Sequence, residues 1–383
     1  MDFTFPPEDD AFRRHARAWL DAHPPDPTPR QWERTLGQGG WIGLGWGETA
    51  YGNRPATLTQ QIVWAEEYAR TKNTPPRPGH IGENLLAPTL LTHGTPAQQA
   101  RFLPGIARGE TIWCQGYSEP GAGSDLAAVR TTATRDATGS YRLTGQKIWT
   151  SHAHEADWCF VLARTEPGSH RHHGLSLLLV PMDQPDGRVE VRPIRQMTGT
   201  SEFNEVFFDG ARADPDHVVG GEGNGWHVAM DLLAAERGVS TLAQQIGFEA
   251  ELECIIQESD LRDPLLRDPL LRDRLVRQWA ELRTMRWNAL RTLGGDDPAA
   301  PSVAKLLWGG WHQRLGELAM AVRGAAGAVG PYDWSEERPY ELDPLQRLFL
   351  FSRADTVYGG SDEIQRTIIA ERVLGLPREA RGQ

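Results

Sequence analysis

The sequence predicts an α+β protein in which helical regions at both ends of the chain flank a β-sheet region. Apolar side chains recur at helical spacing within residues 8–22 and 56–70, and again after residue 226. Between Ile112 and about Val219 the pattern instead alternates every second residue, with frequent turn residues, as it does in strands. We therefore expect an N-terminal helical domain (1–111), a middle antiparallel β-domain (112–222) and a C-terminal helical-bundle domain (223–383).

The N-terminal region is predicted to consist of short helices separated by proline and glycine. Its first helix, 8–22, follows Pro6-Pro7 and leads into the proline-rich connection HPPDPTP. The next segment, 36–53, is too rich in glycine for a regular element. Helices are also expected over residues 56–70, residues 80–92 and a segment that begins at Thr95 or Pro96.

The stretch from Gln115 to Ser151 combines a small-residue loop with alternating strands around a turn at 137–139. Gly121 and Gly123 in the loop let the backbone approach a ligand closely or take a positive φ, and successive N–H groups in such a turn can receive an anion. Ser118 and Ser151 offer hydroxyls and Trp149 offers a flat ring. Together these groups suit a planar, hydrogen-bonding, phosphate-bearing cofactor such as a flavin dinucleotide. Further strands are expected at 175–180 and 205–210.

The C-terminal region reads as long helices joined by proline-containing connections. Residues 259–275 hold a short tandem repeat of R-D-P-L-L, whose prolines interrupt a helix. A turn is expected at 324–327. Helices are expected over residues 226–256, 270–293, 302–323 and 361–374.

Composition excludes several classes of protein. The formal net charge of −11 argues against nucleic acid binding, which needs a basic surface. Cys114, Cys159 and Cys254 are far apart and include no C-x-x-C pair, so neither a disulfide framework nor a zinc site is expected. The chain shows no signal peptide and no apolar run long enough for a membrane span, and a cytoplasmic location fits best.

A cluster of histidines precedes Gly174. His170, His172 and His173 have no distant partner at the spacing of metal ligands. We interpret them as part of a solvated loop and expect no metal site.

The stretch 115–151 resembles the signature of the acyl-CoA dehydrogenase family, in which a T/S-E-P-G-A-G-S-D loop precedes N-G-x-K-x-W-I/T-T/S. A second resemblance to this family lies in 358–377, YGGSDEIQRTIIAERVLGLP. The resemblance to the family as a whole extends over nearly the whole chain. It implies an N-terminal α-helical domain, a middle antiparallel β-domain and a C-terminal four-helix bundle. It also implies FAD as the cofactor and an acyl-CoA thioester as the substrate.

The resemblance further implies which residues border the flavin. Trp149 would pack on the isoalloxazine ring, with Thr150 and Ser151 donating to its N5 and pyrimidine side. The full set implied for the cofactor is Gln115, Tyr117, Ser118, Gly123, Ser124, Trp149, Thr150, Ser151, Gly324, Ser361 and Glu363.

At the usual position of the family's catalytic base, this sequence departs from the family's motif. In most members the base is the glutamate of a Y-E-G-T motif, but here Gly359 occupies that position and can offer only its backbone N–H to the thioester oxygen. Some members place the base directly before an arginine on the long helix after the β-domain, which here is Glu236-Arg237. Glu236 is therefore the expected base, although an ordinary surface Glu-Arg pair remains an alternative. By family position Ser124, Arg237 and Gly360 are expected to bind substrate, and the missing side chain at 359 predicts a branched or bulky acyl group.

A second departure concerns the flavin phosphates. Many relatives carry an R-x-x-F-G…Q pattern on the helix after the base, and residues 253–293 lack it. The expected activity is FAD-dependent α,β-dehydrogenation of an acyl-CoA, with β-hydride passing to flavin N5 and electrons leaving to an electron-transfer flavoprotein. The expected assembly is a homodimer or homotetramer, with a heterotetramer also open. Two alternatives remain: a non-catalytic subunit of a heteromeric dehydrogenase, or a flavoenzyme of this fold acting on a carrier-protein thioester or a nitroalkane.

Overall fold

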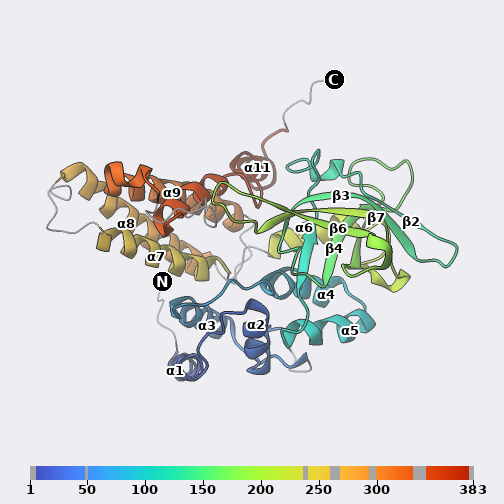
Figure 1. The fold of residues 1–383 in the computed structure, drawn as a ribbon, viewed down its shortest axis with the longest axis horizontal. Coiled ribbons are helices and arrows are strands. Elements are labelled where there is room, and N and C mark those ends of the chain that lie inside the picture. The colour runs from blue at the N-terminus through green and yellow to red at the C-terminus, as the bar shows by residue number, and fades with distance from the viewer. Residues whose placement is uncertain are drawn as a thin grey trace. The chain divides into compact units, whose positions relative to one another are not determined.

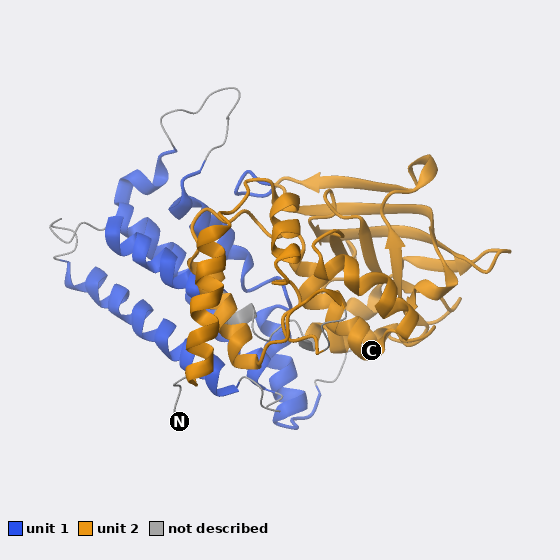
Figure 2. Cartoon of the chain, turned by 90° about the horizontal axis from the view of Figure 1, so that it is seen from below, with its two compact units in different colours: residues 1–5, 196–200, 238–383 blue, residues 6–195, 201–237 orange. Residues whose placement is uncertain are grey.

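The computed structural model describes residues 6–47, 51–235, 240–258, 268–292, 299–330 and 342–378. The chain divides into two compact units, coloured separately in Figure 2. The N-terminal unit comprises residues 6–195 and 201–237, and the C-terminal unit comprises 1–5, 196–200 and 238–383. The N-terminal helices and the sheet fall in one of these units. The division into three domains expected from the sequence stays a prediction.

The helices of the N-terminal unit begin with recognisable caps. Thr57 and Thr95 each accept a hydrogen bond from the backbone N–H three residues later, and Gln60 and Gln98 return one, so α3 and α5 start with capping boxes. The helical elements are α1 (Pro7–Ala22), α2 (Pro29–Gln38), α3 (Leu58–Arg70), the π-helical turn Gly82–Leu86, α4 (Ala87–His93), α5 (Pro96–Ala107) and α6 (Gly225–Ala235). These bounds confirm the helices expected near 8–22, 56–70, 80–92 and 96 onwards.

Helix α2 was not predicted, because it follows directly on the proline-rich connection and has few large apolar residues. Trp32 and Leu36 lie one turn apart on it and are both fully buried. Tertiary burial of these two side chains, rather than periodicity along the sequence, stabilises the helix.

The sheet has eight strands in the order β6-β7-β3-β2-β4-β5-β8, with β1 paired to β4 (Figure 1). Most neighbours are antiparallel, as expected, but β1 and β2 each pair with β4 in parallel, so the sheet is mixed rather than wholly antiparallel. The strands are β1 (Trp113–Gly116), β2 (Thr132–Arg135), β3 (Tyr141–Ser151), β4 (Trp158–Arg164), β5 (Leu175–Pro181), β6 (Val189–Ile194), β7 (Phe203–Ala213) and β8 (Val218–Val219).

Both faces of the central strands are buried. On β4, Phe160 and Leu162 pack into the core shared with the helices, while Val161 packs into a second core on the other face of the sheet. Leu177 and Leu178 on β5 divide in the same way. Burial on both faces explains why β4 and β5 read as continuous apolar runs rather than alternating strands.

The C-terminal unit is a helical bundle around an apolar core. Leu252, Leu282, Leu315 and Leu348 come from four different helices and meet in that core. Its elements are α7 (Ser240–Glu258), α8 (Pro269–Thr292), α9 (Ala300–Arg323), the 3-10 turns Gly324–Ala328 and Ser352–Ala354, α10 (Pro344–Phe351), α11 (Asp362–Ile368) and the π-helical turn Ile369–Val373. No helix in the described ranges is long and apolar enough to cross a membrane.

Two helical segments after residue 224 differ from the sequence-based expectation. The helix expected over 226–256 corresponds to α6 and α7, and the residues between them, including Glu236 and Arg237, lie outside the described residues. Helix α10 was not predicted, since it is only two turns long; its start is set by Asp343, which accepts hydrogen bonds from the backbone N–H groups of Leu345 and Gln346.

Candidate functional site

The loop after β1 is pinned against β3 at its first residues. The backbone N–H of Ile148 donates to the Ser118 carbonyl at 2.9 Å, and Glu119 and Ala122 exchange two backbone hydrogen bonds. Gly121 and Gly123 lie on the exposed part of this loop, and a Cβ atom at either would meet nothing within 4 Å. Neither Gly121 nor Gly123 has a positive φ, so the backbone conformation of the turn does not require glycine at these positions. Their missing side chains leave the loop backbone uncovered.

A buried ion pair fixes this loop. The Lys147 ammonium, with no solvent-exposed surface, donates to Glu119 Oε1 at 2.8 Å and to the carbonyls of Tyr117 and Leu162 at 3.0 and 2.8 Å. Glu119 also accepts from the backbone N–H groups of Arg130 and Thr131. Burial opposes ionisation of Glu119, but the Lys147 charge and these hydrogen bonds outweigh it and lower the pKa of Glu119.

Sequence reasoning missed this pair, although a signal was present. Only three of the 40 basic residues are lysines, Lys72, Lys147 and Lys305. Two of the three, Lys147 and Lys305, are buried and hydrogen-bonded to backbone carbonyls. A compact ammonium with three donors suits such a carbonyl-lined position better than a planar guanidinium.

Trp149 lies on a strained bulge in β3. The pairing of β3 with β7 shifts register between Lys147 and Thr150, and Trp149 between them has φ of 61°. A positive φ is unusual for a bulky residue and costs free energy. The bulge leaves the Trp149 ring 56% exposed, with its edge against Phe203. A large flat ring held outward by a strained backbone is typical of a ligand-binding position.

The residues after Trp149 return to the core. Thr150 is fully buried, and its hydroxyl has no hydrogen-bond partner within the described ranges. Its carbonyl accepts from the Asn204 side chain at 3.0 Å. Ser151 pairs with Phe203, and His152 has a second positive φ, of 53°. The end of β3 therefore combines backbone strain with an orphaned polar atom.

The structure gathers the predicted β-domain residues on β1, the loop and the end of β3. Gln115 and Ser118 are half-buried, Tyr117 is buried and Ser124 is exposed before the 3-10 turn Leu126–Ala128. The remaining predicted cofactor residues, Gly324, Ser361 and Glu363, belong to the C-terminal unit.

Within the C-terminal unit, a glycine turn precedes α11. Gly359 and Gly360 have φ of 63° and 84°. Ser361 caps α11, accepting from the Ile364 N–H, and hydrogen bonds from the backbone N–H of Glu363 and from the Ser361 hydroxyl lower the pKa of Glu363. Gly324 ends α9 with φ of 55°. An added Cβ at Gly359 or Gly324 would meet nothing within 4 Å.

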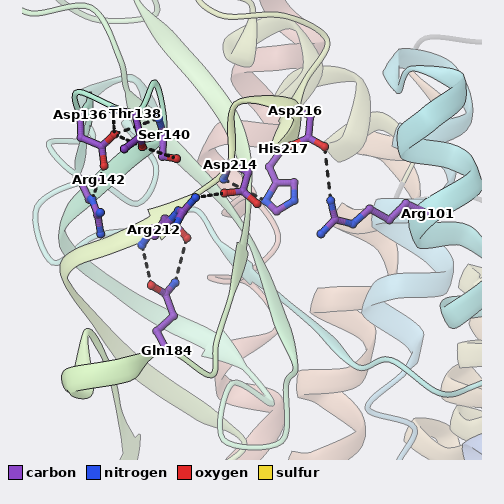
Figure 3. A network of polar contacts seen from close by, with 10 residues as sticks. All are labelled: Arg101, Asp136, Thr138, Ser140, Arg142, Gln184, Arg212, Asp214, Asp216 and His217. Carbon is purple, nitrogen blue, oxygen red and sulfur yellow. Dashed lines mark hydrogen bonds and ion pairs between the residues drawn. The ribbon is translucent and has the colours of Figure 1, made fainter.

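One acidic cluster resembles a metal site in composition but not in bonding (Figure 3). Asp214, Asp216 and His217 bring three possible ligand atoms within 4.8 Å of one another. Each carboxylate already pairs with an arginine, Asp214 with Arg212 at 3.1 Å and Asp216 with Arg101 at 3.5 Å.

His217 belongs to a helix cap rather than to a ligand set. Its Nδ1 accepts from the Asp214 backbone N–H, closing a capping box on the 3-10 turn Pro215–His217. Its ring lies edge-on against Phe102 and Trp158, and burial lowers the pKa of His217. We assign no site to this cluster. The three histidines 170, 172 and 173 are exposed on the connection between β4 and β5.

Comparison with known proteins agrees with the sequence motifs over the whole chain. Residues 6–110, 114–211 and 223–374 match the family models of the N-terminal, middle and C-terminal domains of acyl-CoA dehydrogenases. Acyl-CoA dehydrogenase IpdE1 of Mycobacterium tuberculosis is 55% identical over 92% of this chain and 89% of its own length, and IpdE1 of Mycolicibacterium smegmatis is 53% identical over 92% and 89%.

Solved structures give the same result. The Tcur3481-Tcur3483 steroid ACAD superposes with a TM-score of 0.84 at 27% identity, covering 99% of this chain and 100% of that one. The ChsE4-ChsE5 complex from Mycobacterium tuberculosis superposes with a TM-score of 0.83 at 29% identity, covering 99% and 100%. The chain belongs to the acyl-CoA dehydrogenase family and is an FAD-dependent oxidoreductase.

Proposed function

We propose that this enzyme dehydrogenates a bulky, ring-bearing acyl-CoA thioester of the steroid-derived class to its 2,3-enoyl thioester. The observation that carries this is Gly359, which stands where the family resemblance implies a glutamate base. A side chain is missing there, and among the described residues no heavy atom lies within 4 Å of an added Cβ. A similar structure is named a steroid ACAD, which supports the substrate class.

The β-domain residues fit the flavin that the family uses. The exposed Trp149 ring offers a flat surface, the buried Thr150 hydroxyl needs a partner, and Gly121 and Gly123 leave the loop backbone uncovered. Gln115, Tyr117, Ser118, Ser124 and Ser151 complete this surface in our proposal. Gly324, Ser361 and Glu363 stay proposed cofactor residues of the C-terminal unit, considered separately. When bound, the flavin supplies at N5 the acceptor for the β-hydride of the substrate.

The chain's own groups would handle the proton and the carbonyl. Glu236 takes the α-proton, since Gly359 at the usual position of the base has no carboxylate. The backbone N–H of Gly359 donates to the thioester oxygen, where negative charge develops as the proton leaves. Ser124, Arg237 and Gly360 stay candidates for substrate binding by family position alone.

The test is anaerobic flavin bleaching with a panel of acyl-CoAs of increasing bulk. Glu236→Gln should slow bleaching by about 10²- to 10⁴-fold, the usual contribution of a positioned base. Glu253→Gln, which changes an exposed carboxylate on α7, is the matched control and should bleach at the wild-type rate. Wild-type rates for Glu236→Gln, or a wild-type preference for short straight chains, would contradict the proposal.

Assembly with another chain of this family is part of the proposal. Val276, Trp279 and Trp287 lie on one face of α8 and are each more than half exposed, which is unusual for such large apolar side chains. The chain also lacks the flavin-phosphate motif R-x-x-F-G in 253–293. A second copy, or a different subunit as in the ChsE4-ChsE5 complex, would cover the α8 face and complete the flavin site.

The same observations favour one alternative function, a non-catalytic subunit of a heteromeric dehydrogenase. A preparation that holds no flavin, with or without a partner subunit, would decide for this alternative. Bound flavin that is bleached by an acyl-CoA, in an assembly whose reduced form passes electrons to an electron-transfer flavoprotein, decides for the enzyme.

A further inference from the structure

A buried histidine in the C-terminal unit contacts two carboxylates at once. His312 on α9 is 6% exposed. Its Nδ1 lies 2.5 Å from Asp355 Oδ2, and its Nε2 lies 2.9 Å from Glu251 Oε2 on α7. A neutral imidazole carries one N–H only, so two carboxylate acceptors require both ring nitrogens to be protonated. With both carboxyl groups ionised, His312 carries both N–H protons as an imidazolium ion.

The surroundings of His312 agree with that charge. Burial, the largest single influence, lowers the pKa of His312, but the hydrogen bonds and charges of Asp355 and Glu251 outweigh it and raise the pKa to about 9. The Phe248 ring from α7 covers the imidazole at 4.4 Å between ring centroids. The Lys305 ammonium donates to the Asp355 backbone carbonyl.

Asp355 also contacts the turn that follows it in the chain. Its second carboxylate oxygen, Oδ1, accepts from the Tyr358 hydroxyl at 2.7 Å. The Tyr358 ring in turn lies 4.6 Å from the Lys305 ammonium. A Cβ atom at Gly309 on α9 would come within 3.1 Å of the Asp355 carbonyl, so helix and segment are in close contact. Tyr358 therefore contacts α9 in two ways: through Asp355, which pairs with His312, and through its ring, which lies against the Lys305 ammonium.

The turn that follows needs such an anchor. Gly359 and Gly360 both have positive φ, a region that glycine enters and leaves freely. On its far side the turn is held by the Gln365 side chain, which donates to the Gly360 carbonyl at 3.1 Å, and by the Asp362 N–H, which donates to the Thr356 carbonyl at 3.0 Å. Tyr358 is the last residue with a side chain before the two glycines.

We infer that His312, clamped between Glu251 and Asp355, is a positioning residue that holds the Tyr358–Ser361 turn in one conformation through the Asp355–Tyr358 hydrogen bond. Its consequence for catalysis rests on the proposed function, in which Gly359 donates to the thioester oxygen. The consequence for the turn itself does not depend on the reaction.

Amide hydrogen exchange of residues 356–361 in the full-length protein without substrate tests the inference. In the wild type, exchange corrected for its intrinsic pH dependence should accelerate as the pH rises through about 9, where His312 loses its proton. Among the described residues, Lys305 and Tyr358 face this cluster besides Glu251 and Asp355. His312→Gln should exchange about tenfold faster at pH 7 and lose the pH dependence.

Tyr358→Phe separates positioning from folding. It keeps the ring beside Lys305 and removes only the hydroxyl that Asp355 accepts, so the turn should exchange faster while the midpoint of global unfolding stays near that of the wild type. His227→Gln, which changes an exposed histidine 3.5 Å from Asp231, is the control and should leave the turn unchanged.

The outcomes are distinct. Wild-type exchange of residues 356–361 in both His312→Gln and Tyr358→Phe would overturn the inference, as would a wild-type turn that shows no acceleration near pH 9. If His312→Gln does not fold, Tyr358→Phe and the wild-type pH series decide. Faster exchange with no bleaching of wild-type flavin by any acyl-CoA would support the positioning role and refute the proposed function. Where bleaching occurs, Tyr358→Phe should lower kcat by about tenfold with flavin affinity retained.

Discussion

The Lys147 ammonium lies 2.8 Å from Glu119 Oε1, and this contact joins the strand that carries Trp149 to the loop that carries Gly121 and Gly123. Lys147 has no exposed side-chain surface and Glu119 has 8%. The two parts of the 115–151 signature, the loop and the strand, thus meet at one buried ion pair, which holds the loop against β3.

Lys147→Met should destabilise the protein by about 3–5 kcal/mol, because it leaves the Glu119 charge and the Tyr117 and Leu162 carbonyls without their buried donor. Urea unfolding of the apoprotein measures this. Adding Glu119→Gln should recover part of the loss, since the unpaired charge is then removed. A double variant no more stable than Lys147→Met would show that the ion pair is not the cause.

Trp149→Gly should separate stability from cofactor binding. Glycine relieves the positive φ of 61°, so the free energy of unfolding of the apoprotein should stay the same or rise by about 1 kcal/mol. FAD affinity should fall by about tenfold or more as the flat ring is lost. Flavin fluorescence titration beside denaturant unfolding checks both, and unchanged FAD affinity would remove Trp149 from the cofactor site.

The His312 cluster should make stability depend on alkaline pH. The folded-state pKa of about 9 lies above the ordinary value of 6.5, so the contribution is complete below about pH 6.5, declines as the pH rises and is lost above about pH 9. It amounts to about 3 kcal/mol, the product of the pKa difference and the free energy per unit. Denaturant unfolding from pH 6 to 10 should show this decline in the wild type and a flatter profile in His312→Gln.

Gly359→Glu should narrow the substrate range. The new residue must adopt a φ of 63°, at a cost of about 1–2 kcal/mol, but its Cβ has room. If the open space receives a bulky acyl group, the variant should reject ring-bearing acyl-CoAs while short acyl-CoAs are less affected. Stopped-flow flavin reduction with both classes measures the ratio. An unchanged ratio would place the acyl group elsewhere.

The exposed face of α8 should govern assembly. Replacing Trp279 and Trp287 by glutamine should lower the mass of the complex in light scattering after size-exclusion chromatography, with helical content retained. Leu270→Gln, which changes a 74%-exposed residue at the start of α8, tests whether the effect is specific to the face. A double variant with the wild-type mass would exclude this face as the interface.

Much of the fold could be predicted from local pattern. Helices α1, α8 and α9 were expected within one to two residues of their bounds, because each is long and carries its own apolar face. Helices α2 and α10 were missed because both are short and depend on neighbouring elements for burial of side chains such as Trp32 and Leu345. The parallel pairing of β1 and β2 with β4 was also missed, since alternation along a strand says nothing about its partner's direction.

By itself the sequence determined the family and the cofactor, and it predicts the β-domain residues of the site, because Gln115–Ser151 is one continuous stretch whose motifs are read in order. Only the tertiary structure decided that Lys147 pairs with Glu119, that Trp149 is held on a strained bulge, and that His312 is charged between Glu251 and Asp355. Along the chain, His312 is 43 positions from Asp355 and 61 positions from Glu251. Burial and charge act through space, and helix packing brings such groups within hydrogen-bonding distance without leaving a periodic signal in the sequence.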